Sequence, residues 1–190
     1  MMINMRPRES RKVDVQHLAL LGMFLAVALV LTAVESFLPP LQFMPPGVKI
    51  GLSNVITMYC LFCFDQKSVF ALAVLKSVFV FLISGFTAFL LSLGGGLLSI
   101  CVMIFVSFAF RNVSYLLLSI AGAIAHNIGQ IIIASFLMSS MLVLAYLPVL
   151  LISGVIMGGV TGALLRLVMP AMTKLHLRLS KASITLSKKN

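Results

Sequence analysis

The 190-residue sequence has few charged residues: only 9% are Asp, Glu, Lys or Arg, whereas 61% are hydrophobic. In a soluble domain about a quarter of the residues are charged. This composition excludes a soluble globular domain and predicts an integral membrane protein. At roughly 20 residues per span, the length allows about six transmembrane helices within one domain.

Acidic residues are the scarcest charged group. The whole chain has four, and two of them precede the first apolar run. Chemistry that needs clustered carboxylates, such as the Asp-rich magnesium sites of prenyl diphosphate condensation, therefore lacks its ligands. An autonomous ion-coupled carrier is disfavoured too, because only Glu35 lies near a span. The acidic residues are Glu9, Asp14, Glu35 and Asp65.

Two further motifs that often carry chemistry are incomplete. Gly94-Gly95-Gly96 is not followed by the Lys-Ser or Lys-Thr of a nucleotide loop, so we attribute it to helix flexibility or close packing. Cys60-x-x-Cys63 has no second cysteine pair and no nearby histidine to complete a tetrahedral metal site. With Cys101, these cysteines lie in apolar runs and are interpreted as packing residues. We predict no catalytic residue, no metal site and no cofactor.

Basic residues gather at the two ends of the chain and give a formal net charge of +10. Lys and Arg beside spans stay on the cytoplasmic side, so this pattern predicts cytoplasmic termini and an even number of spans. The charge then reflects topology and contact with the lipid bilayer, not nucleic-acid binding. We divide the chain into a basic tail (1–14), a membrane domain (15–169) and a second basic tail (170–190).

Prolines, glycines and charged residues divide the apolar sequence into helices. The second and third helices are short for a span, so at least one must be tilted or extended. The predicted fold class is all-α, a polytopic bundle of six transmembrane helices. The six helices are expected at about 15–36, 52–64, 68–83, 88–110, 114–138 and 141–168.

Polar side chains within the apolar runs are the candidate site residues, because each costs several kcal/mol in lipid unless it faces protein or water. Lys76 lies near the middle of the third helix, and His126, Asn127 and Gln130 lie on adjoining faces of the fifth. We favour a ligand site. The alternatives are a lysine that snorkels or pairs with a carboxylate, and polar side chains that only join helices.

The loop before the second helix reads Met-Pro-Pro-Gly-Val-Lys-Ile-Gly over residues 44–51. Lys49 is the only cation expected on the outer side, and Asn54 lies in the first turn of the next helix, where free N–H groups favour an anion. We expect this loop to cover a ligand, with Glu35 pairing a lysine or contacting the ligand. An ordinary rigid connection is the alternative.

Small residues mark two packing surfaces. Ala19, Gly22 and Ala26 form a smooth stripe on the first helix, which is suited either to internal packing or to a partner. The glycines of Gly154-x-x-x-Gly158 and Gly158-x-x-x-Gly162 recur on the last helix. There we expect packing between helices of the same chain.

Four stretches resemble a known family. They read P-P-G-V-K-I-G-L-S-N-V (45–55), F-D-Q-K (64–67), L-K-S-V-F-V-F-L-I-S-G (75–85) and A-H-N-I-G-Q (125–130). The first three are similar to substrate-binding S components of bacterial energy-coupling-factor (ECF) vitamin transporters, especially the riboflavin-specific group. Together with the fourth stretch and the six spans, nearly the whole membrane domain more closely resembles the Gx transporter family, which is also labelled heptaprenyl diphosphate synthase component I.

The resemblance implies a protein of the bacterial plasma membrane that captures a small vitamin-like or cofactor-precursor molecule, flavin- or quinone/isoprenoid-related, from outside. Its partners would be an energising module of one transmembrane T subunit and two ATPases. Lys49, Asn54 and Lys76 would lie in the binding region, and the stripe on the first helix would dock the module. One departure is that only Gly22-x-x-x-Ala26 keeps the four-residue spacing of that stripe. The alternative is a non-catalytic membrane subunit that assists prenyl or quinone metabolism.

Overall fold

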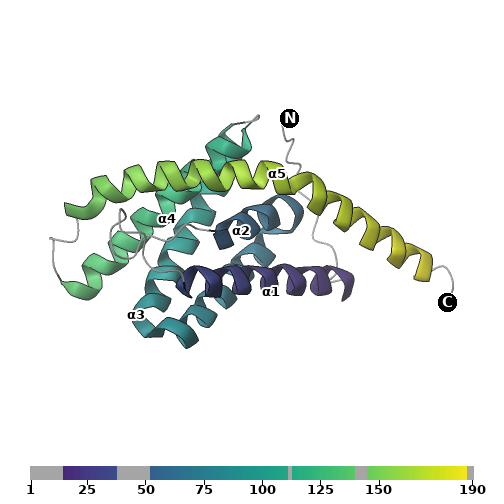
Figure 1. The fold of residues 1–190 in the computed structure, drawn as a ribbon, viewed down its shortest axis with the longest axis horizontal. Coiled ribbons are helices and arrows are strands. Elements are labelled where there is room, and N and C mark those ends of the chain that lie inside the picture. Colours follow the sequence, from purple (N-terminus) through teal and green to yellow (C-terminus); the bar gives the residue numbers. More distant parts are fainter. Residues whose placement is uncertain (1–14, 38–51, 111–112, 140–144, 188–190) are drawn as a thin grey trace.

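The computed structural model describes residues 15–37, 52–110, 113–139 and 145–187, and these residues form helices with short connections. Figure 1 shows the helices lying against one another, with α5 running along the bundle. The all-α prediction is confirmed. The helices are α1 (Val15–Phe37), α2 (Leu52–Cys63), α3 (Gln66–Ala109), α4 (Tyr115–Met138) and α5 (Leu147–Ser187).

Helix α3 is a hairpin of two arms that meet at Gly85. That residue has φ 85° and ψ −177°, while the 44-residue element is otherwise helical. The arms run antiparallel, because Ser77 Oγ of the first arm lies 3.3 Å from Ser92 Oγ of the second. The break predicted between the third and fourth helices is therefore confirmed. Each arm holds about 20 residues, enough for one span.

Gly85→Ala is expected to destabilise the protein by about 1–3 kcal/mol, because this combination of φ and ψ is almost confined to glycine. Thermal unfolding of the detergent-solubilised protein measures the effect. The control is Gly22→Ala, since Gly22 lies within a helix and has no atom within 4 Å of an added Cβ. Equal melting temperatures for the two variants would contradict the hairpin geometry.

Several helices have the length and composition of membrane spans. Four described helices qualify, if α3 is counted once, and this makes the chain a membrane protein. Helix α2 is shorter, with 12 residues. Its side chains from Val55 to Cys60 are all buried, so neighbouring helices surround this stretch. Because α2 is enclosed by protein, its short length leaves little backbone exposed to lipid.

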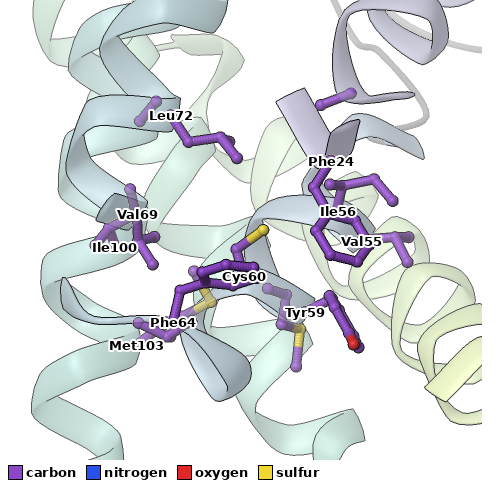
Figure 2. Close-up of a cluster of buried hydrophobic side chains, with 14 of the residues drawn as sticks. Phe24, Val55, Ile56, Tyr59, Cys60, Phe64, Val69, Leu72, Ile100 and Met103 are labelled. Atoms are coloured by element: carbon purple, nitrogen blue, oxygen red, sulfur yellow. The ribbon is translucent and has the colours of Figure 1, made fainter. Parts of the chain in front are cut away.

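The core lies where α1, α2 and the arms of α3 meet. Figure 2 shows Phe24 of α1 beside Tyr59 of α2, and their ring centroids are 4.9 Å apart. Cys60 is buried in the same cluster, in agreement with the packing role expected from the sequence. Cys101 differs because it is exposed on α3. The apolar cluster holds α2 in place beside α3, which matters for the site described below.

The last helix differs from its predicted bounds. It begins at Leu147 and continues to Ser187, whereas an end near residue 168 was expected. Pro170 lies inside this helix. A proline removes one backbone hydrogen bond, but its φ is helical, so a helix can continue past it with a kink. Its C-terminal part extends away from the other helices (Figure 1). The predicted start near residue 141 falls among residues 140–144, outside the described part.

Candidate functional site

A cavity of about 230 Å³ lies inside the bundle, and side chains from all five described helices line it. It reaches toward the end of the bundle where α1 ends and α2 begins: Glu35 lies in the last turn of α1 and Asn54 in the first turn of α2. The volume is somewhat below the usual range of ligand pockets, about 300–1,000 Å³, so it suits a small molecule.

Lys76 reaches the cavity from the first arm of α3. Its Nζ donates a hydrogen bond to Asn54 Oδ1 of α2 at 3.0 Å. Glu35, only 8% exposed, lines the same cavity. One cation and one anion therefore face a shared space within an apolar bundle. A charge at this depth is tolerable where polar groups or water solvate it.

The polar residues of α4 line the opposite wall. His126, Asn127 and Gln130 all border the cavity. Asn127 Nδ2 also donates to the Leu150 carbonyl of α5 at 2.7 Å, so part of its hydrogen-bonding capacity joins two helices. The interhelical alternative thus holds for one group of Asn127. The two interpretations coexist because an amide has several donor and acceptor positions.

Two of the three consecutive glycines of α3, Gly94 and Gly95, allow α4 to pack closely against α3. A Cβ added at Gly95 would lie 2.9 Å from His126 Cε1 and 3.0 Å from Gln130 Cγ. Across the same contact, a Cβ at Gly129 would lie 2.7 Å from the Gly94 carbonyl oxygen. Close packing, one of the two explanations offered for the glycine run, is therefore the one observed at Gly94 and Gly95. It holds the His126 and Gln130 side chains against α3.

Six of the seven residues predicted to bind substrate line this one cavity: Glu35, Asn54, Lys76, His126, Asn127 and Gln130. Their role in binding stays a prediction. Lys49, the seventh, lies outside the described residues. The docking residues Ala19, Gly22 and Ala26 lie elsewhere, because all three are exposed on α1. The cavity and the stripe are thus two separate features of the bundle.

Sequence reasoning missed most of the hydroxyl and thioether groups in the lining. Nine Ser or Thr residues and three Met residues border the cavity. A signal for them existed: Ser53 and Thr57 are four residues apart, and Ser92 and Ser99 are seven apart, so each pair lies on one helix face. A polar face on an otherwise apolar helix points toward a polar interior.

Comparisons with known proteins agree with this architecture. A family model described as heptaprenyl diphosphate synthase component I matches residues 24–168. A solved structure of the S component of a bacterial ECF transporter superposes with a TM-score of 0.54 at 22% identity, covering 83% of this chain and 95% of that chain. No curated protein sequence matches the chain. At this identity the structural match shows the fold alone.

Proposed function

Because this chain belongs to the heptaprenyl diphosphate synthase component I family, the Gx transporter family, and has the fold of an ECF-transporter S component, we propose that it captures a small molecule for transport. The observation that carries the proposal is the polar cavity. Lys76, Glu35 and the α4 amides face one partly open cavity between apolar helices. Such a site needs a polar occupant, because hydrocarbon cannot solvate these groups.

The proposed direction of transport is inward across the bacterial plasma membrane. If both termini are cytoplasmic, the end of α1 and the start of α2 lie on the outer side. The cavity, which reaches toward that end, would then receive its ligand from outside. The proposed ligand is vitamin-like or a cofactor precursor, related to flavins or to quinones and isoprenoids. An energising module with a T subunit and two ATPases would drive its release.

Catalysis by this chain alone is not proposed. Glu35 is the only carboxylate among the lining residues, and the described part of the chain holds no group of three His, Cys, Asp or Glu that would bind a metal ion. Prenyl diphosphate condensation and ATP hydrolysis both need bound magnesium. The family's name, heptaprenyl diphosphate synthase component I, favours a second candidate function, a non-catalytic subunit that assists prenyl or quinone metabolism.

Native mass spectrometry of the gently extracted protein tests the capture function. We expect one small molecule to remain bound to each chain, and we expect the wild-type chain to accumulate it in proteoliposomes only when the ATPase module is present. Co-purification separates the two candidates, because an ATPase partner supports transport and a prenyltransferase partner supports the alternative. Finding no retained molecule would contradict the capture function, and finding no ATPase partner would contradict ATP-driven transport.

Gly22→Leu is expected to prevent assembly with the energising module while leaving the fold intact. An added Cβ at Gly22 has no atom of this chain within 4 Å, and a large side chain there would protrude from the surface that we propose for docking. The control is Gly159→Leu, which also has no atom within 4 Å but lies on α5. Pull-down of the ATPases measures assembly. Equal recovery with both variants would contradict docking through α1.

A further inference from the structure

Most of the hydroxyl groups that line the cavity already donate their protons to other protein atoms. Seven of the nine Ser and Thr side chains that line the cavity donate to another protein atom. Within their own helices, Thr32 Oγ1 donates to the Ala28 carbonyl at 2.8 Å and Ser77 Oγ to the Ala73 carbonyl at 2.9 Å. These bonds span four residues and are a common way for a helix to satisfy a hydroxyl in an apolar setting.

Other hydroxyl groups of the lining form hydrogen bonds between helices. Ser99 Oγ of α3 donates to the Gly122 carbonyl of α4 at 2.8 Å. Thr161 Oγ1 of α5 donates to the Met157 carbonyl and lies 2.7 Å from Ser119 Oγ. Thr161 has only one proton, so when that proton goes to the Met157 carbonyl, Ser119 is the donor in the pair. These three lining hydroxyl groups are therefore hydrogen-bonded to other protein atoms across or within helices.

A hydroxyl has one proton but two lone pairs, so these side chains offer the cavity mainly acceptor capacity. The carboxylate of Glu35 and the thioethers of Met58, Met103 and Met157 add further acceptors. Donor side chains in the lining are fewer: they are Lys76, His126 and the amides of Asn54, Asn127 and Gln130. Turning a hydroxyl around to donate to a ligand would cost its existing hydrogen bond. The lining therefore complements a molecule that brings its own donors.

The net charge of the cavity lining restricts the class of ligand further. The described lining holds one lysine and one glutamate, so it is balanced when the histidine is neutral. A phosphate ester or diphosphate would bring about two or more negative charges into this space, and burying them without matching cations is costly. An uncharged or zwitterionic molecule adds no net charge to the cavity and avoids this desolvation cost.

We propose that the captured molecule is a small, unphosphorylated compound with several O–H or N–H donors, such as a polyol, an amine or an N–H heterocycle, and with one carbonyl or other acceptor at Lys76. The proposal rests on the capture function and narrows its substrate class. Quinones, which present only acceptors, and prenyl diphosphates, which present only anionic oxygens, are poor matches for this lining. An external phosphatase reaction would have to precede uptake of any phosphorylated precursor.

Binding titrations on the purified full-length chain test this with matched compounds. Riboflavin is compared with its tetra-acetyl ester, and pyridoxine with pyridoxine 5′-phosphate, while menadione and isopentenyl diphosphate represent acceptor-only and diphosphate ligands. The donor-bearing member of at least one pair should bind about tenfold or more tightly than its counterpart and than the last two compounds. If menadione, isopentenyl diphosphate or a masked compound binds as tightly, the donor-rich class is wrong and the capture function stands.

Two serine variants separate the cavity oxygens from general packing. Ser99→Ala removes an acceptor from the lining and should weaken the best-binding compound about fivefold. Ser107→Ala is the control: Ser107 lies on the same arm of α3 and donates to the Met103 carbonyl, but does not line the cavity. Its affinity should stay within about twofold of the wild type. Equal losses with both variants would contradict the proposal.

If none of the six compounds binds, native mass spectrometry shows whether the substrate class or the capture function is wrong. A retained molecule without O–H or N–H groups, or with a phosphate, overturns the substrate class alone. One with several such donors and no phosphate supports it. No retained molecule at all overturns the capture function itself.

Discussion

Gly158→Ala is expected to lower the melting temperature of the solubilised protein strongly, with a loss of roughly 1–3 kcal/mol. A Cβ at this position would lie 2.7 Å from Ile120 Cα, which is backbone of α4 and cannot rotate away. The two helices would have to separate along their contact. Alanine gains up to about 1 kcal/mol of helix propensity over glycine, but the collision with backbone outweighs this gain.

The neighbouring glycine supplies the control. Gly159 lies in the same turn of α5 and has no atom within 4 Å of an added Cβ. Gly159→Ala should therefore leave the melting temperature unchanged or raise it slightly, because only the helix-propensity gain remains. Thermal unfolding followed by circular dichroism compares the two. If Gly158→Ala unfolds at the same temperature as Gly159→Ala, the close contact between α4 and α5 is wrong.

Lys76→Met is expected to weaken binding of the retained molecule by about 10- to 100-fold, because it removes the cation and its charged hydrogen bonds from the cavity. The melting temperature should change little, since methionine fills similar space without a buried charge. Lys67→Met is the control. That lysine is exposed at the start of α3, far along the arm from the cavity.

A purely structural role for Lys76 predicts a different result in the same experiment. If Lys76 serves mainly to neutralise Glu35, then Lys76→Met and Glu35→Gln should each lower the melting temperature, with affinity per folded molecule unchanged. Titrations and thermal shifts on both variants distinguish the two cases. A loss of stability without a loss of affinity would remove Lys76 from the binding site and would leave the cavity with a structural ion pair.

The chemistry of single residues was enough to predict the helices and the most polar residues of the site. Proline and glycine break helices through their own backbones, and charged residues cannot stay in hydrocarbon, so the breaks near residues 65, 85 and 112 were readable from the sequence. The same cost marks Lys76 and His126, because a strongly polar side chain in an apolar run needs a polar environment wherever it lies.

The hydroxyl lining could not be read in the same way. Ser77 and Thr161 satisfy their protons within their own helices, so they carry little cost in either lipid or protein, and the sequence does not show which way they face. Their position depends on how helices rotate against one another. The close contacts at Gly95 and Gly158 set those rotations.

The sequence by itself determined the membrane class, the helical fold, the break between residues 83 and 88 and the polar residues that would need a common interior, because each follows from the cost of placing one residue in lipid or in a helix. The sequence also predicted one ligand site for Glu35, Lys76 and Gln130, and the structure places all three around one cavity. Tertiary structure alone decided that hydroxyl oxygens from most of the helices around it line this cavity. It also decided that α5 continues past Pro170. These features depend on contacts between segments distant in the sequence, so the free-energy cost of placing any single residue does not reveal them.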